Sequence, residues 1–116
     1  MQPTVLIIEA RREVAEALRT VMSSANFVPV VMAHLDRFTD LPATPAVIVV
    51  RIAFETESDP PHKAIERLAP HRPPVVAIVW EEDEFQEAQR LQCDVILRAP
   101  HEINRLCDTI ARLART

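Results

Sequence analysis

Five short runs of apolar residues divide this chain at nearly regular intervals. The runs do not alternate between apolar and polar residues, most of their members are β-branched, and each is too short for a helix of ordinary length. Continuous apolar runs of this kind are typical of parallel strands that are buried on both faces. We therefore expect strands over residues 5–8, 28–32, 46–50, 75–79 and 94–97. Pro29 favours an edge position for the second strand, and the strongly apolar third run favours a central one.

Amphipathic stretches follow the strands. Apolar residues at steps of three and four predict a first helix over 12–25 and a closing helix from 103 onward; they are Val14, Ala17, Leu18, Val21 and Met22, then Ile103, Leu106, Cys107, Ile110 and Leu113. Further helices are expected over 35–41, 62–68 and 81–91, with an exposed loop over 55–61. This alternation predicts one α/β domain over residues 1–116, with a parallel sheet, helices on both faces and function at the carboxyl ends of the strands.

The absence of glycine excludes several functions. The chain has no glycine and 10 prolines, whereas P-loops and dinucleotide fingerprints need glycine where the backbone approaches phosphate. ATP, GTP and NAD binding of those types is therefore excluded. The net charge of −4 at pH 7 argues against a domain that neutralises nucleic-acid phosphates, so we expect no direct binding of nucleic acid.

The two cysteines and the hydropathy of the chain indicate its environment. Cys93 and Cys107 lie in hydrophobic surroundings without CxxC spacing, so we expect neither a disulfide framework nor a zinc site, and a reducing, cytoplasmic setting. No run approaches the roughly 18 apolar residues of a membrane span, and the N-terminus lacks the features of a signal peptide. We expect a soluble protein that does not contact a membrane.

Several strings resemble the receiver domain of bacterial two-component response regulators, which is a flavodoxin-like domain. Residues 4–9 (TVLIIE) resemble its opening strand, residues 45–50 (PAVIVV) its central strand, residues 74–79 (PVVAIV) its fourth strand, and residues 94–100 (DVILRAP) its fifth strand with the following proline. The resemblance covers nearly the whole chain. It implies a single three-layer, doubly wound (βα)5 domain with strand order 2-1-3-4-5.

The same resemblance puts unsuitable residues at the receiver's phosphorylation site. Receivers accept a phosphoryl group on an aspartate after the third strand, with Mg²⁺ held by acidic residues after the first, and a hydroxyl residue and a lysine after the fourth and fifth. In this chain the pocket consists of Glu9 and Ala10 at the acidic pair, Arg51 at the nucleophile, Val79 and then Trp80 at the hydroxyl position, and Ala99 and then Pro100 at the lysine position. We interpret the chain as a degenerate pseudo-receiver with no catalytic residue, metal or cofactor.

Glu9 and Arg51 are expected at the carboxyl ends of adjacent strands, close enough for a charge-assisted pair. We expect this salt bridge to replace the metal and to hold one conformation; the alternative is that Arg51 binds an anion. Trp80 is expected to pack over the emptied pocket or to stack on Arg51. The alternative for Trp80 is an anchor in a protein interface.

The other polar groups receive structural interpretations. The acidic run over residues 81–84 is interpreted as a solvated helix start that complements the helix dipole. All histidines are expected at the surface or in loops: His34, His62, His71 and His101, the last close enough to the pocket to titrate usefully. Cys93 and Cys107 are interpreted as small core residues.

Receivers commonly dimerise or contact an output domain through the face made by the helix over 81–91, the fifth strand and the closing helix. The residues expected on this face are Phe85, Ala88, Gln89, Arg90, Arg98, Asn104, Arg105 and Asp108. The alternative is that this face is simply the amphipathic outside of two helices, and nothing in the sequence separates the two interpretations.

The leading functional hypothesis is a phosphorylation-independent module of a two-component-type regulator. It would act by binding a protein partner, such as an output domain or another signalling protein, or by forming a homodimer, and it would be a piece of a longer regulator. One alternative is a phosphoacceptor in a phosphorelay that uses an unexpected carboxylate such as Glu9 or Asp59. The other is a sensor that binds a small ligand in the vacated pocket.

Gln92 stands where receivers commonly have a glycine, in the turn before the fifth strand. We therefore expect a left-handed backbone at Gln92, at some energetic cost. Replacing glycines in such loops stiffens the chain, which suits a domain that does not switch.

Overall fold

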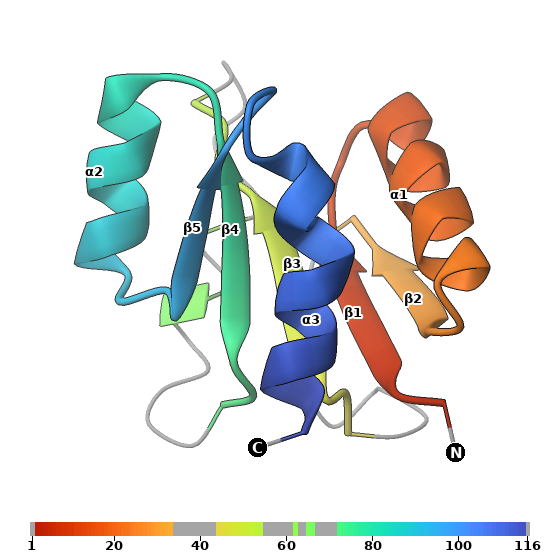
Figure 1. Cartoon of the computed structure of the whole chain (residues 1–116). Helices are drawn as coiled ribbons and strands as arrows, with labels where there is room; N and C mark the ends of the chain where they lie inside the picture. The colour runs from red at the N-terminus through yellow and green to blue at the C-terminus, as the bar shows by residue number, and fades with distance from the viewer. Residues whose placement is uncertain (1, 34–43, 55–61, 63–64, 67–71, 116) are drawn as a thin grey trace.

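Five parallel strands form one sheet in the order β2-β1-β3-β4-β5 (Figure 1). The strands of this computed structural model are β1 (Thr4–Ile8), β2 (Val28–Met32), β3 (Val47–Arg51), β4 (Val75–Val79) and β5 (Val95–Arg98). The structure describes residues 2–33, 44–54, 62, 65, 66 and 72–115. The predicted fold class and strand order are confirmed, as are the edge position of the strand with Pro29 and the central position of β3.

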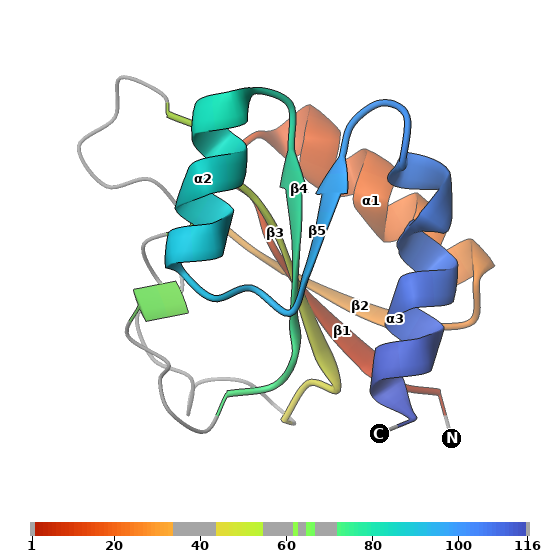
Figure 2. The same cartoon turned by 60° about the vertical axis from the view of Figure 1, so that its left-hand side comes forward.

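Three α-helices of the described residues cover the sheet: α1 (Arg12–Ser24), α2 (Glu82–Arg90) and α3 (Leu106–Ala114). Helices α1 and α3 lie on one face and α2 lies on the other, so the molecule has three layers (Figure 2). The helix predicted over 35–41 and the loop predicted over 55–61 fall outside the described residues. Of the helix predicted over 62–68, only residues 62, 65 and 66 are described, and they lie in 3-10 turns.

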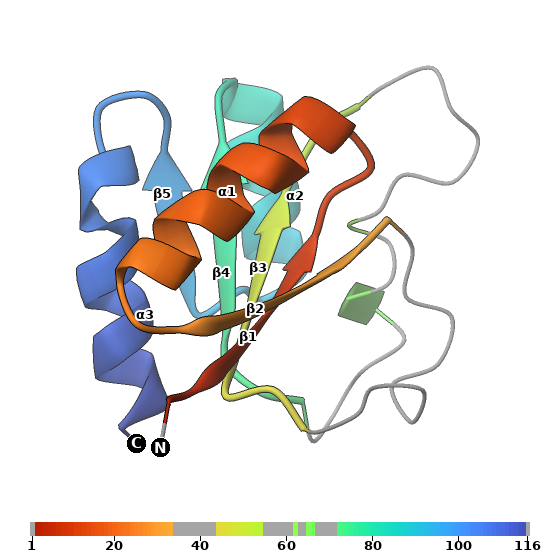
Figure 3. The ribbon, with the colours of Figure 1, turned by 90° about the vertical axis from the view of Figure 1, so that its right-hand side faces the viewer.

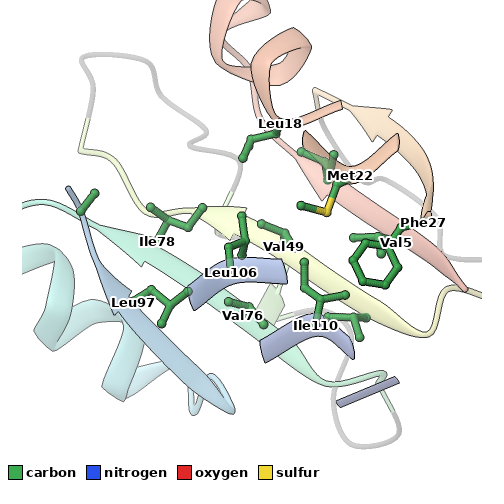
Figure 4. Close-up of a cluster of buried hydrophobic side chains, with 13 residues drawn as sticks. Val5, Leu18, Met22, Phe27, Val49, Val76, Ile78, Leu97, Leu106 and Ile110 are labelled. Carbon is green, nitrogen blue, oxygen red and sulfur yellow. The ribbon is translucent and has the colours of Figure 1, made fainter. Parts of the chain in front are cut away.

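The two faces of the sheet bury separate sets of side chains, because successive residues of a strand point to opposite faces. In β1, Val5 and Ile7 pack with α1 and α3, whereas Leu6 and Ile8 pack on the α2 side. Figure 4 shows the first cluster, in which Ile110 of α3 lies close to the sheet. Both faces of the central strands are therefore buried, which explains the unalternating apolar runs.

Only part of the apolar surface of helix α1 faces the core. The buried residues are Ala15, Leu18 and Met22, whereas Ala17 is exposed and Val21 is 44% exposed. The helix carries two overlapping apolar stripes, and the core takes only one of them as α1 crosses the sheet (Figure 3). The predicted helix is confirmed, but Ala17 and Val21, two of the five apolar residues that indicated it, do not pack in the core.

The starts of the last two helices differ in character. At α2 a capping box joins Glu81 and Glu84, and the Trp80 backbone N–H also donates to Glu84 Oε1 at 2.7 Å. The interpretation of the acidic run as a helix start is thus confirmed. Helix α3 begins at Leu106 rather than at residue 103, because Ile103–Arg105 forms the 3-10 turn η3.

Two non-glycine residues adopt a left-handed backbone, Asn26 with a φ of 66° and Gln92 with a φ of 58°. The prediction for Gln92 is confirmed, while Asn26 was not foreseen. Asparagine tolerates this region better than glutamine does, because its short side chain can form local hydrogen bonds. The turn before β5 therefore holds the more strained of the two residues.

Replacing Gln92 with glycine is expected to raise the free energy of unfolding by up to about 1 kcal/mol. Glycine removes the clash of the left-handed conformation, and its greater freedom in the unfolded chain offsets part of that gain. Urea denaturation measures the change, with Asn26→Gly as the matched control at the other left-handed position. An equal or larger gain for Asn26→Gly would contradict this account of strain.

Candidate functional site

Glu9 and Arg51 meet at the carboxyl edge of the sheet. Strand β1 pairs with β3 so that Ile8 lies opposite Val50, which puts the next residues, Glu9 and Arg51, level with each other. Both side chains lie on the face of α1 and α3, since they continue the alternation of Val5, Ile7 and Val49. Strand register alone therefore brings this carboxylate and this guanidinium together.

The contact between them is bidentate. Arg51 Nε donates to Glu9 Oε2 at 2.5 Å, and Arg51 Nη2 donates to Glu9 Oε1 at 3.0 Å. The backbone N–H of Arg11 donates to the same Oε1 at 2.8 Å. The Glu9 side chain is 2% exposed and that of Arg51 is 13% exposed. The predicted salt bridge is confirmed, and it is an almost completely buried one.

This geometry determines the electrostatics of the edge. Both oxygens of the Glu9 carboxylate accept hydrogen bonds, and its negative charge is balanced by a guanidinium in direct contact. A hard cation prefers several oxygen ligands of net negative charge. The edge instead offers one neutralised carboxylate next to a fixed positive group, and Arg51 has no nucleophilic oxygen that could accept a phosphoryl group.

The other predicted pocket residues separate into two groups. Val79 is buried in the cluster on the α2 side, so it does not join the site. Trp80, Ala99 and Pro100 lie with Arg51 around a cavity on the opposite face. Trp80 is 57% exposed, so it lines the pocket without being buried over it.

The cavity has a volume of about 400 Å³. Its sheet side is formed by Arg51, Ile78 and Ala99, at or just after the ends of strands β3, β4 and β5, and its opposite wall by α1.

 The wall from α1 consists of Val14, Ala17, Leu18 and Val21. These residues form the second apolar stripe of α1, the one that the core does not take. The cavity therefore adjoins the ion pair and has one helix as its opposite side.

Sequence reasoning missed the α1 wall of this cavity. A signal for it exists, because Val14, Ala17, Leu18 and Val21 follow the i, i+3, i+4, i+7 spacing of one helix face. That stripe overlaps the one that packs on the sheet, through Ala15, Leu18 and Met22. The rotation of the helix decides which stripe is buried, and the sequence alone does not fix that rotation.

His62 is buried, and its expected position at the surface is wrong. Its side chain is 1% exposed, and Nε2 lies 3.5 Å from Glu87 Oε2 of α2. The ring meets Phe54 edge-on, with the ring centroids 5.6 Å apart. Burial follows from this contact and from Glu87, two partners that lie far from His62 in the sequence. His101 is exposed, as predicted, while His34 and His71 lie outside the described residues.

Glu87 of α2 belongs to a small charged cluster with Arg90, Glu66 and His62. Hydrogen bonding from the Arg90 guanidinium lowers the pKa of the Glu87 carboxyl below its ordinary value, and His62 acts in the same direction. Arg90 also pairs with Glu66. A carboxyl whose pKa is lower in the folded state stabilises the fold above its unfolded pKa, and this contribution is lost as the pH falls through the folded value.

We therefore expect Glu87→Gln to destabilise the protein at pH 7 and to have less effect at acid pH. The difference in free energy of unfolding from the wild type should be largest above about pH 5 and should shrink below it. Urea denaturation at pH 7 and pH 3.5 measures the difference. Glu16→Gln, on the exposed side of α1, is the control. A Glu87→Gln deficit that persists unchanged at pH 3.5 would contradict the charged interaction.

Both cysteines are free and partly buried. Burial raises the pKa of the Cys93 thiol to about 11 and also raises the pKa of the Cys107 thiol. Since the thiolate is the reactive form, neither group is activated as a nucleophile. This agrees with their interpretation as small core residues.

The predicted interface residues do not all lie at the surface. Ala88 is completely buried against the sheet, because it is on the inner side of α2, so it cannot contact a partner. Arg98 of β5 lies over the Phe85 ring, 4.0 Å from its centroid, and Arg98 Nη1 is 3.2 Å from Glu82 Oε2. Five further members of the predicted interface are exposed: Gln89, Arg90, Asn104, Arg105 and Asp108. The face is thus largely polar, with one cation-π contact at its centre.

The described part of the chain has neither a cluster of metal ligands nor a helix that could span a membrane. Among residues 2–33, 44–54, 62, 65, 66 and 72–115, no group of three or more His, Cys, Asp or Glu side chains could hold a metal ion. No helix in the same part of the chain is long and apolar enough to cross a membrane.

Solved structures share this arrangement of strands and helices. A response regulator receiver protein from Burkholderia phymatum is 19% identical, with a TM-score of 0.78 over 98% of this chain and 96% of that one. The receiver domain of a Francisella response regulator is 16% identical, with a TM-score of 0.78 over 98% of each chain. The signal receiver domain of a modulated diguanylate cyclase from Desulfovibrio desulfuricans is 23% identical, with a TM-score of 0.75 over 99% and 95%. No protein-family model and no curated protein matches the sequence.

The class of fold is therefore the flavodoxin-like α/β sheet with helices on both faces. Within that class, the chain has the receiver fold of two-component regulators. Receiver domains are generally non-enzymatic modules that contact other signalling proteins. At these sequence identities the similarity establishes the fold, and the residues at the carboxyl edge must be considered on their own chemistry.

Proposed function

We propose that this chain is a pseudo-receiver, a signalling domain that works through protein contacts and is not phosphorylated. The observation that carries the proposal is the buried pair of Arg51 and Glu9 at the edge where receivers hold their phosphoacceptor and metal. Arg51 Nε lies 2.5 Å from Glu9 Oε2. The pair occupies the site with a neutral, fully hydrogen-bonded contact.

The chemistry of phosphoryl transfer explains why this pair matters. A receiver needs a carboxylate nucleophile and a cation that neutralises the phosphoryl oxygens. At the corresponding edge, the third strand ends in a guanidinium, and Ala10, Val79 and Ala99 have no group that binds a metal or a phosphoryl oxygen. Separating the two buried charges would cost free energy, so the pair holds the domain in one conformation.

Protein contacts are one way for such a domain to signal without phosphorylation. The face made by α2, β5 and α3 presents Phe85 and Arg98 in contact with each other, with exposed polar residues on both sides. Aromatic residues and arginine are enriched in protein interfaces. The proposal takes residues 1–116 as one receiver-like domain of a cytoplasmic regulator whose partner is an output domain, another signalling protein or a second copy of the chain.

Incubation with acetyl phosphate and Mg²⁺, followed by intact-mass measurement, tests the absence of phosphorylation. We expect no mass increase for the wild-type chain, under conditions in which a receiver with its aspartate gains one phosphoryl group. A gain of one phosphoryl group on the wild type would overturn the proposal and would favour the alternative of an unexpected carboxylate acceptor. Peptide mapping would then identify that carboxylate.

Sedimentation of the full-length gene product, with and without Phe85→Ala/Arg98→Ala, tests the contact face. We expect the substitutions to weaken self-association or binding of the attached output domain without unfolding the protein. Their circular dichroism spectra should match that of the wild type. Unchanged association would show that the face around Phe85 and Arg98 is not the contact surface.

A further inference from the structure

The cavity beside the ion pair reaches from the surface into the core. It lies between α1 and the ends of β3, β4 and β5, and its volume is about 400 Å³, which falls within the range of about 300–1,000 Å³ that is common for small-molecule pockets. Three of its lining residues, Leu18, Ile78 and Ala99, also belong to the buried cluster on this face of the sheet. A small molecule in the cavity would therefore contact the core itself, which a flat partner surface resting on the rim does not reach.

Exposed apolar side chains surround the mouth of this cavity. Five large apolar side chains of the described residues are exposed, and three of them line the cavity: Val21 at 44%, Trp80 at 57% and Ile103 at 39%. These three come from α1, the residue after β4 and the turn η3, so separate elements contribute to one apolar rim. Covering them removes apolar area from water, which favours an apolar occupant.

The composition of the lining favours an occupant without charge. Eleven described residues line the cavity; nine of them are apolar, and none is an aspartate or a glutamate. The other two are arginines, and neither is without a partner: Arg51 makes the bidentate contact with Glu9, and Arg11 also interacts within the chain. An anion that approached Arg51 would also approach the Glu9 carboxylate, which repels it. Any ion that moves from water to apolar surroundings also loses favourable hydration.

We propose that this cavity binds an uncharged, largely hydrocarbon small molecule, held between the exposed apolar stripe of α1 and the ends of β4 and β5. The proposal rests on the cavity and its apolar lining, and it goes beyond the function proposed above, which rests on the ion pair. Phosphorylation of the chain would overturn that function and leave this inference untouched, so either proposal can fail without the other.

Two dyes with the same ring skeleton measure the preference for an uncharged molecule. N-phenyl-1-naphthylamine is uncharged, whereas 8-anilino-1-naphthalenesulfonate has the same rings and a sulfonate group; both become brighter when they leave water for apolar surroundings. We expect the uncharged dye to bind the wild-type chain saturably and about tenfold or more tightly than the sulfonate dye, because burying an ionised group costs free energy. No saturable binding of the uncharged dye, or equally tight binding of the sulfonate dye, would overturn the proposal.

Two pairs of variants locate the dye. Ala17→Phe adds a ring to the α1 wall of the cavity from an exposed position and should weaken binding of the uncharged dye by about tenfold or more. Thr20→Phe adds the same ring at an exposed position of α1 outside the lining and should leave binding unchanged. Ile103→Asp puts a carboxylate on the apolar rim and should weaken binding by a similar factor. Asn104→Asp, at the next residue of η3 and outside the lining, is its control.

The pattern across these variants decides what occupies the cavity. If Ala17→Phe and Ile103→Asp change binding no more than their controls do, the dye lies elsewhere and the proposal is overturned. A self-association that Ala17→Phe abolishes, in a chain that does not bind the uncharged dye, would assign the cavity to a second copy and would also overturn it. Circular dichroism spectra of all four variants ensure that only folded proteins are compared.

Discussion

Replacing Arg51 with leucine is expected to lower the free energy of unfolding by about 3–5 kcal/mol at neutral pH. The Glu9 side chain is 2% exposed, so the substitution leaves a buried carboxylate that, among the described residues, keeps the hydrogen bond from the Arg11 backbone and has lost both of those from Arg51. A domain of this size typically has only about 5–15 kcal/mol of stability. Thermal and urea denaturation measure the loss of free energy. The variant should be close to complete unfolding at moderate temperature.

A double variant shows whether the loss comes from the buried charge. Glu9→Gln/Arg51→Leu is the matched control, because neutral residues often replace a buried ion pair at little cost. Equal destabilisation by the single and the double variant would show that lost packing, not the buried carboxylate, is responsible.

The fold was predictable because its main signals are local. Each strand is a short apolar run, and the three longest helices that the structure describes show the periodicity of one apolar face. The strand order needed the resemblance to receivers, since strand neighbours depend on contacts that hydropathy does not encode. The observed helix boundaries differ from the predicted ones by a few residues where local backbone geometry sets them. The closing helix was predicted from residue 103, but the 3-10 turn η3 begins there and α3 follows it.

The candidate site was predictable only where it depends on strand ends. Glu9 and Arg51 were expected to meet because parallel neighbours end at the same edge, and the register brings them level. The rotation of α1 depends on which stripe packs better against the sheet, so the spacing of its apolar residues did not show that Ala17 and Val21 face the cavity. Burial of His62 depends on Phe54 and Glu87, contacts between distant segments that no local pattern reveals.

We expect that two substitutions at the carboxyl edge can restore an acidic site that binds Mg²⁺ in place of the ion pair. Ala10→Asp/Arg51→Asp places three carboxylates, with Glu9, at the ends of β1 and β3. Without a cation their repulsion should destabilise the protein, and Mg²⁺ should restore stability because it binds only the folded site. At a Mg²⁺ concentration about 100 times the dissociation constant, the stabilisation is about 2.7 kcal/mol. Thermal denaturation with increasing MgCl₂ measures it.

The control for this variant is Ala10→Asn/Arg51→Asn, which has similar side-chain volumes but leaves one carboxylate and so should respond to Mg²⁺ no more than the wild type does. A matched concentration of NaCl accounts for ionic screening, which also reduces repulsion between carboxylates. If the aspartate variant gains nothing from Mg²⁺ beyond the effect of NaCl, residues 9, 10 and 51 do not converge as they do in a receiver. Arg51 would then not occupy the position that the phosphoacceptor aspartate has in a receiver.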